Sequence, residues 1–188
     1  MTKSHYFYAL SLSNEVKKSL LMFSNEMKER FPFKKWVHHE DYHITLAFLG
    51  HINSEQLTSL NQDLEWKLKN TSEINLTIEH TGVFGKSDAP RILWAGMEQS
   101  EPLIQLQKII YEHCVENGLK LDKRPYNPHI TLARKWDSDD PFNLQEFRNY
   151  SKQKFPVLSD TIQAVTLFQT HLDRTPKYEI RKRFKLQI

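Results

Sequence analysis

The pentapeptide His43-Ile44-Thr45-Leu46-Ala47 recurs letter for letter as His129-Ile130-Thr131-Leu132-Ala133. The second copy begins close to half a chain length after the first, in a chain of 188 residues. An exact repeat of this length is rarely accidental, and self-similarity at a fixed spacing is typical of duplicated architectures. The sequence therefore predicts two similar halves, each of which contributes one copy of the motif.

Each copy is expected to be a strand with two different faces. Successive side chains of a strand point to opposite sides, so His43 and Thr45 share one face and Ile44 and Leu46 share the other. The same alternation holds for the second copy. The apolar pair should face the core, while histidine and threonine should line the space between the halves. If a pseudo-twofold axis relates the halves, two histidines and two threonines converge on one cleft.

These side chains suit hydrolysis of a cyclic phosphodiester. Histidine titrates near neutral pH, so one imidazole can accept a proton from water while the other protonates the departing sugar oxygen. Threonine hydroxyls can donate hydrogen bonds to the non-bridging phosphate oxygens. Nothing in this chemistry requires a metal or another cofactor. A competing interpretation is two edge strands with incidental polar faces, and two identical copies favour the catalytic interpretation.

The composition is that of a globular protein with 39% hydrophobic and 26% charged residues. A net charge of +3 mildly favours an anionic partner. No apolar run approaches the length of a membrane span, and none resembles a secretion signal. The single cysteine, Cys114, excludes an internal disulfide and fits a reducing compartment. We expect a cytoplasmic protein that does not contact a membrane.

The pattern of apolar residues predicts strands mixed with a few helices. Because strands and helices do not alternate strictly, this order favours an α+β fold. No linker divides the chain, so we expect one domain over residues 1–188, with two interleaved lobes. Strands are expected at 6–12, 43–50, 74–79, 91–97, 129–134, 161–169 and 177–186, and helices at 14–30 and after the caps Asn53, Ser100 and Asn143.

The paired His-x-Thr-Leu motifs resemble the 2H phosphoesterase superfamily, specifically the bacterial and archaeal RNA 2′,3′-cyclic phosphodiesterases once called 2′-5′ RNA ligases. Segments over nearly the whole chain share the resemblance: Trp36-Val37, Phe48-Leu49-Gly50, Gly82-Val83-Phe84, residues 91–96, residues 124–128, Leu167 and Tyr178. The chain departs from the family in two loops, at Gly85-Lys86 and Pro176-Lys177. These departures put the range of substrates in doubt rather than the chemistry.

The resemblance implies a bilobal fold in which antiparallel sheets flank a central cleft. It also implies that a 2′,3′-cyclic phosphate at an RNA 3′ end is hydrolysed to a 2′-phosphomonoester. Carried onto this chain, His43 is the proton donor to the leaving 3′ oxygen and His129 is the proton acceptor from water. Thr45 and Thr131 hold the phosphate. A pseudo-symmetric site could also divide these two roles the other way.

Arg134 and Phe48 occupy equivalent positions after the two copies. The resemblance implies that Arg134 binds the phosphate, which suits a guanidinium. Ideal strand alternation, however, turns Arg134 away from His129 and Thr131, so it reaches the cleft only if the strand twists or bulges. Phe48 is expected to belong to the core rather than to stack on a base.

Several other residues allow alternative interpretations. His38, His39 and His43, with Glu40-Asp41, could be read as a metal site, although we expect solvated histidines. Trp36, Trp94 and Trp136 could stack on bases, although structural packing is the commoner role. The basic stretch 181–185 could guide RNA, although its alternation indicates a strand with one solvated face.

Three functional hypotheses remain open at this stage. The first is an RNA-end cyclic phosphodiesterase. The second keeps the site but acts on small cyclic nucleotides or 2′-5′ linked oligonucleotides. The third is an RNA-binding module without catalysis, which would have no need of two titrating groups. In each case we expect a monomer with no obligate protein partner.

Overall fold

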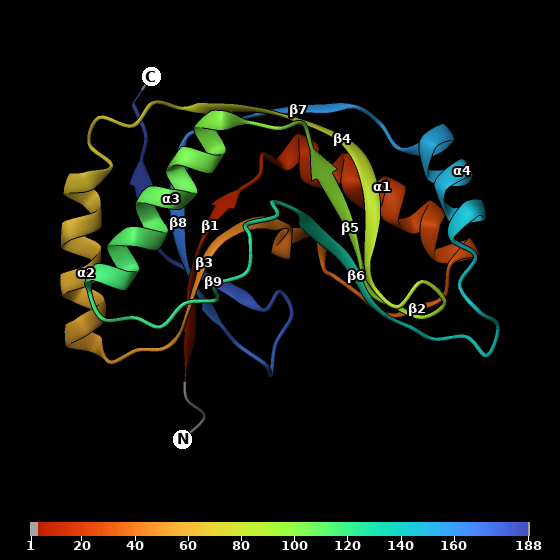
Figure 1. The fold of residues 1–188 in the computed structure, drawn as a ribbon, viewed down its shortest axis with the longest axis horizontal. Helices are drawn as coiled ribbons and strands as arrows, with labels where there is room; N and C mark the ends of the chain where they lie inside the picture. The colour runs from red at the N-terminus through yellow and green to blue at the C-terminus, as the bar shows by residue number, and fades with distance from the viewer. Residues whose placement is uncertain (1–3, 188) are drawn as a thin grey trace.

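A computed structural model describes residues 4–187, which form an α+β fold, as predicted (Figure 1). The strands are β1 (His5–Ser11), β2 (Phe33–Trp36), β3 (His43–His51), β4 (Ile74–Gly85), β5 (Pro90–Met97), β6 (Ile130–Trp136), β7 (Leu158–Ile162), β8 (Ala164–Thr170) and β9 (Tyr178–Lys185). The helices are α1 (Asn14–Arg30), α2 (Ser54–Lys67), α3 (Glu101–Glu116) and α4 (Leu144–Lys154), with a 3-10 turn, η1, at His39–Asp41.

The strands follow the order β7-β4-β5-β6-β3-β1-β8-β9, and β2 pairs with β6. All of these named strands pair in antiparallel fashion. Strands β3 and β6, which carry the repeated motif, meet only in the Ile44–Ile130 pair within the described residues. We call β3, β1, β8 and β9 the first sheet, and β7, β4, β5, β6 and β2 the second sheet. The two expected sheets are therefore joined at one point.

Two helices, α1 and α3, cross between the two halves. Helix α1 follows β1 of the first sheet but contacts β7 of the second, whereas α3 follows β5 of the second sheet but contacts β3 of the first. Figure 1 shows α2 and α3 at one end of the molecule and α1 and α4 at the other. The apolar stripe of α1 is fully buried, as its 3.6-residue spacing predicts: Val16, Leu20, Phe23 and Met27. Each half thus buries its sheet with a helix from the other half.

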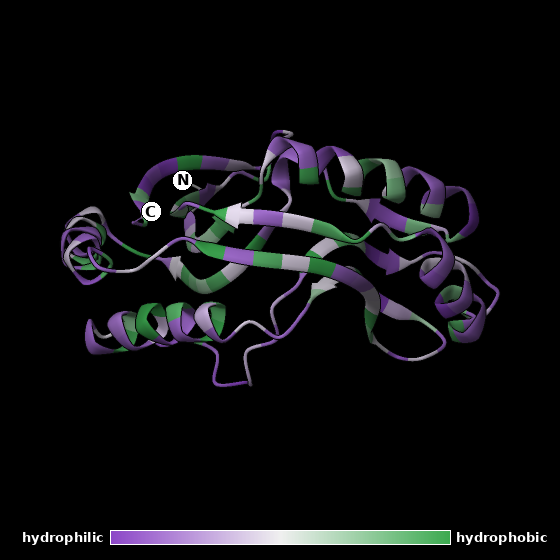
Figure 2. Cartoon of the chain, turned by 90° about the horizontal axis from the view of Figure 1, so that it is seen from above, coloured by the Kyte–Doolittle hydropathy of each residue, from purple (hydrophilic) through white to green (hydrophobic). Residues whose placement is uncertain are grey.

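Helix starts follow their caps closely. Ser13, Asn53, Ser100 and Asn143 each accept a hydrogen bond from the backbone N–H three residues later. Along the strands, hydrophobic and hydrophilic residues alternate, as Figure 2 shows. Within residues 4–187, no helix combines the length and apolar character needed to cross a membrane.

One predicted strand is wrong. The pattern over residues 161–169 predicted a single strand, but the chain breaks at Gln163 into β7 and β8. Strand β7 pairs with β4 of the second sheet, and β8 pairs with β1 of the first. The chain changes sheets at this residue, and local hydrophobicity carries no signal for such a crossing. Strand β2 was not predicted because it has only four residues.

Candidate active site

The two copies of the motif lie side by side as antiparallel strands, related by a local pseudo-twofold axis. Ile44 pairs with Ile130, and both side chains are fully buried. Because the strands are antiparallel, His43 lies toward Thr131 and His129 lies toward Thr45. Side chains alternate, so all four polar residues emerge on the face opposite the two isoleucines. The structure therefore brings His43, Thr45, His129 and Thr131 onto one face between the sheets.

Both imidazoles are held in the same way. His43 Nδ1 lies 2.7 Å from the Asp41 carbonyl oxygen, and His129 Nδ1 lies 2.8 Å from the Asn127 carbonyl oxygen. A carbonyl oxygen can only accept, so Nδ1 carries the proton in each ring and Nε2 is left to act on a substrate. The two copies differ at Nε2, since that of His43 lies 3.1 Å from the Thr45 hydroxyl.

Both histidines have a lower pKa than an ordinary histidine. Burial lowers the pKa of His43 to about 4, and the positive charges at His129 and Arg134 act in the same direction. The hydrogen bond to the Asp41 carbonyl and the Asp41 carboxylate oppose this shift of the His43 pKa. Burial also lowers the pKa of His129, again with a contribution from Arg134. A bound phosphate anion favours the protonated form and would raise both pKa values.

Each copy of the motif contains a β-bulge at the same residue. Leu46 has no partner on β1, because Thr45 pairs with Ala9 and Ala47 pairs with Tyr8. Leu132 likewise has no partner on β5, because Thr131 pairs with Trp94 and Ala133 with Leu93. A bulge inserts one extra residue and so shifts the alternation of the side chains beyond it. The residues after the bulges, Phe48 and Arg134, therefore return to the face of the histidines.

This shift accounts for the position of Arg134 and corrects the expectation for Phe48. Arg134 pairs with Lys35 of β2 and Ile92 of β5, and its charge lowers the pKa of both histidines. The bulge required for Arg134 to reach the cleft is thus present. Phe48 was expected in the core, and that prediction is wrong, because 65% of its side chain is exposed.

Aromatic side chains surround both histidines. The ring of Phe7 lies 4.9 Å from that of His43, and Tyr178 meets His43 edge-on at 5.1 Å. On the second sheet, Phe84 meets His129 edge-on at 5.0 Å. Sequence reasoning missed Phe7 as part of the site, because its place depends on which strands are neighbours in the sheet.

Asp41 is a second residue that sequence reasoning did not place correctly. Its carboxylate is buried and accepts hydrogen bonds at 2.9–3.0 Å from the backbone N–H groups of Lys177 and Tyr178. Its backbone carbonyl accepts from His43. Asp41 therefore links the β8–β9 turn to the first histidine and holds Tyr178 against it.

The residues that allowed alternative interpretations have their own structural partners. His38 Nδ1 accepts from the Glu40 N–H, and His39 Nε2 lies 3.2 Å from the Glu40 carboxylate. Over residues 4–187, no group of three or more His, Cys, Asp and Glu side chains is arranged to hold a metal ion. Trp36, Trp94 and Trp136 are half-buried among other aromatic residues. In β9, Arg181 pairs with Glu179, and Lys182 pairs with Glu65.

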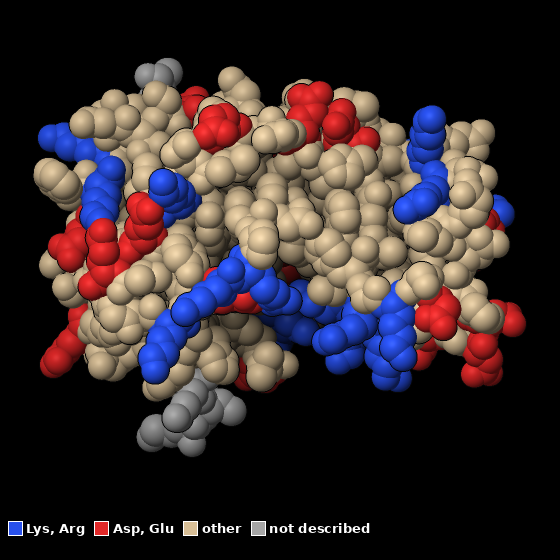
Figure 3. Space-filling model, in the orientation of Figure 1, with Lys and Arg blue, Asp and Glu red and all other residues tan. Residues whose placement is uncertain are grey.

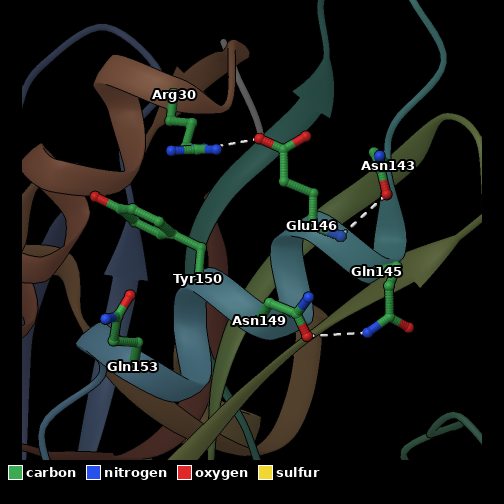
Figure 4. A pocket seen from close by; sticks show the side chains of 7 residues that line it. All are labelled: Arg30, Asn143, Gln145, Glu146, Asn149, Tyr150 and Gln153. Carbon is green, nitrogen blue, oxygen red and sulfur yellow. Dashed lines mark hydrogen bonds and ion pairs between the residues drawn. The ribbon is translucent and has the colours of Figure 1, made fainter.

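A separate surface groove is lined by neither histidine. That groove, of about 520 Å³, lies along α4 and the end of α1, where Arg30 pairs with Glu146 at 2.7 Å (Figure 4). Its lining is mostly amide and charged side chains, with no pair of titratable groups poised for proton transfer. Lys and Arg side chains instead gather in a band across the lower part of the face in Figure 3, over β9, β6 and β2. Such a band suits a polyanion.

The chain is similar to one protein family, to relatives that share one name, and to a solved structure. The family described as the 2′-5′ RNA ligase superfamily matches residues 16–174. The chain is 37% identical over 188 residues to an RNA 2′,3′-cyclic phosphodiesterase of Geobacillus stearothermophilus, covering 99% of this chain and 58% of that longer protein. A Bacillus subtilis protein of the same name is 30% identical, with 99% and 97% covered. The fold matches E. coli LigT complexed with 3′-AMP at a TM-score of 0.77, with 24% identity and 99% of each chain covered.

Proposed function

The chain belongs to the 2′-5′ RNA ligase superfamily, and from this premise we propose that it hydrolyses the 2′,3′-cyclic phosphate at an RNA 3′ end to a 2′-phosphomonoester. The observation that carries the proposal is the Ile44–Ile130 pair, which turns both His-x-Thr pairs toward the same space. Relatives named RNA 2′,3′-cyclic phosphodiesterase at 37% and 30% identity support the substrate class.

In the proposed reaction, the two histidines act on opposite sides of the phosphorus atom. His129 Nε2 takes a proton from water, the water oxygen bonds to phosphorus, and the P–O3′ bond breaks. His43 Nε2 gives its proton to the leaving O3′. His129 ends protonated and His43 ends neutral, so proton exchange with solvent restores the starting state. No second subunit is needed, because one chain supplies both groups.

The remaining polar residues stabilise the phosphate. Thr45 and Thr131 donate their hydroxyls to the non-bridging oxygens, and the Arg134 guanidinium neutralises developing charge. Burial favours the neutral form of both imidazoles, which suits His129 as a base. His43 must be protonated to act as an acid, and the negative charge of the incoming phosphate favours that state.

The test is an RNA oligonucleotide with a 2′,3′-cyclic end, incubated with the protein in EDTA. We expect quantitative conversion to the 2′-phosphomonoester, identified by phosphorus NMR and by its resistance to enzymes that remove 3′-phosphates. A 3′-phosphate product would contradict the assignment of the leaving oxygen. Activity that requires an added divalent cation would contradict metal-independent catalysis. Turnover of small cyclic nucleotides alone, or binding without turnover, would favour the competing hypotheses.

A further inference from the structure

Two neighbouring cations lie on the second sheet, on the face that carries His129. Lys35 of β2 is the direct cross-strand partner of Arg134 of β6, and residues that pair directly share one face of a sheet. Both side chains are exposed. They belong to the part of the sheet, over β6 and β2, where Lys and Arg gather in Figure 3. Strand β2 thus adds a second positive charge beside the Arg134 guanidinium.

The protein itself does not neutralise these two cations. Among residues 4–187, no carboxylate lies within ion-pair distance of Lys35 or Arg134. The preceding residue, Lys34, faces the other way along the strand and pairs with Asp137 at 3.9 Å. Like charges directly opposite each other on two strands are destabilising. An anion bound between Lys35 and Arg134 would relieve this repulsion, so the pair indicates an anionic ligand on this face.

The first sheet carries no such pair of charges. Phe48 occupies the position that Arg134 has in the second sheet, and its side chain is uncharged. Apart from the Ile44–Ile130 pair, no described strand lies beside β3 as β2 lies beside β6. In the proposed reaction, water approaches phosphorus from the His129 side. The oxygen that water adds therefore emerges at the sheet that carries both cations.

Hydrolysis changes the charge of the terminal phosphate. The cyclic diester carries one negative charge. Water first converts it to a monoester whose P–OH group contains the water oxygen, and this group then releases its remaining proton to solvent with a pKa of about 6. At neutral pH the 2′-phosphomonoester is therefore mostly a dianion. Its second charge arises on the side of the site where Lys35 stands beside Arg134.

We propose that Lys35, beside Arg134, binds the ionised water-derived oxygen of the 2′-phosphomonoester, so that the protein binds its product more tightly than the cyclic substrate. The inference rests on the proposed function, because that reaction places the new oxygen on the His129 side. Arg134 lowers the pKa of both histidines, whereas Lys35 is not among the charges that do so. Lys35 therefore lies farther from the groups that move protons, and its long flexible side chain suits a contact with the departing product.

The first test compares the binding of two RNA oligonucleotides by isothermal titration calorimetry. One ends in a 2′-phosphate, and the other is identical but ends in two hydroxyls. At about pH 7.5, Lys35→Gln should raise the Kd of the phosphate-ended RNA by about 3- to 10-fold, as expected for a charge-assisted contact at an exposed position. It should change the Kd of the hydroxyl-ended RNA by less than about twofold. At about pH 5 the terminal phosphate carries mainly one charge, so the effect of Lys35→Gln on the phosphate-ended RNA should also fall to about twofold or less.

The second test uses the cyclic-ended RNA in steady-state assays. Lys35→Gln should lower kcat/KM by only about twofold, because the substrate has a single charge, while the inhibition constant of the product rises as its Kd does. Lys35→Arg should retain tight product binding, because it keeps the charge. Lys34→Gln is the matched control, since it removes the same charge from the adjacent residue on the opposite face, and it should leave product binding unchanged. Circular dichroism checks the fold of each variant.

The outcomes distinguish this inference from the proposed function. If the wild-type protein does not turn over the cyclic-ended RNA, the proposed function fails. If it does, equal weakening of phosphate-ended and hydroxyl-ended RNA by Lys35→Gln would overturn the inference, because Lys35 would then contact the RNA backbone. An unchanged Kd in Lys35→Gln, a full effect at about pH 5, or the same effect in Lys34→Gln would overturn it as well. Each of these results would leave the proposed function intact.

Discussion

Replacing Asp41 should weaken the fold and change the pH dependence of catalysis together. Its carboxylate accepts hydrogen bonds from two backbone N–H groups, those of Lys177 and Tyr178, at 2.9–3.0 Å. A hydrogen bond to a charged group contributes about 1.5 to 3 kcal/mol. Lys177 is exposed, so water can replace part of the hydrogen bonding that its N–H loses when the carboxylate is removed. We therefore expect Asp41→Ala to lower the free energy of unfolding by about 2 to 4 kcal/mol, less than the full value of two such bonds.

Asp41→Asn is the more informative variant for catalysis. It keeps one acceptor oxygen and should cost only about 1 to 2 kcal/mol of stability, which leaves the protein folded. The negative charge of Asp41 raises the pKa of His43, so its removal lowers that pKa further. A general acid is active below its pKa, so the alkaline limb of the kcat/KM profile should move to lower pH.

Urea denaturation measures the stability of each variant, and the pH profile of kcat/KM is measured on the cyclic-ended RNA. Glu40→Gln is the matched control, because it removes the neighbouring carboxylate in η1, which pairs with Lys17 and His39 instead. It should leave the profile unchanged. A folded Asp41→Asn protein with the wild-type alkaline limb would refute the link between this carboxylate and His43.

The remaining predictions concern the catalytic set itself. His43→Ala and His129→Ala should each lower turnover by ~10² or more without unfolding the protein. The control variant His51→Ala, on the same strand as His43, should have little effect on turnover. Single-turnover kinetics measure the activity of each variant, and circular dichroism checks its fold. The pH profile of kcat/KM should be bell-shaped with its maximum below pH 6.5, since burial lowers the pKa of both histidines. The maximum of kcat should lie at higher pH, because bound phosphate raises both pKa values. A flat profile from mildly acidic to mildly alkaline pH would contradict catalysis by this pair of histidines. Arg134→Gln should lower kcat/KM on the cyclic-ended RNA by about tenfold or more and Arg134→Lys by less, as steady-state assays would show, because a lysine keeps the charge but not the planar guanidinium.

Local signals in the sequence were sufficient for most elements. Side-chain caps mark the starts of α1, α2, α3 and α4, because the capping hydrogen bond spans only three residues. The exception at Gln163 has a physical cause: two strands that pair with different sheets can be adjacent in sequence without any change of residue type.

The bulges show why the face of Phe48 and Arg134 could not be predicted. Alternation along an isolated strand turns both residues away from the histidines. A bulge is defined by two strands, since it exists only where Leu46 and Leu132 lack partners on β1 and β5. Those partners come from distant parts of the chain, so no residue within the pentapeptide indicates that the side-chain alternation shifts.

The sequence alone determined the repeat, its two histidines and two threonines, and the class of chemistry that such a set supports. Those conclusions depend on residue identity and on the alternation of a strand, which are local properties. Tertiary structure alone decided that Ile44 faces Ile130, that Asp41 holds Tyr178 against His43, and that an aromatic ring on one side of the site is matched by a guanidinium on the other. Each of these depends on contacts between segments far apart in the chain, which form only when the two sheets are assembled.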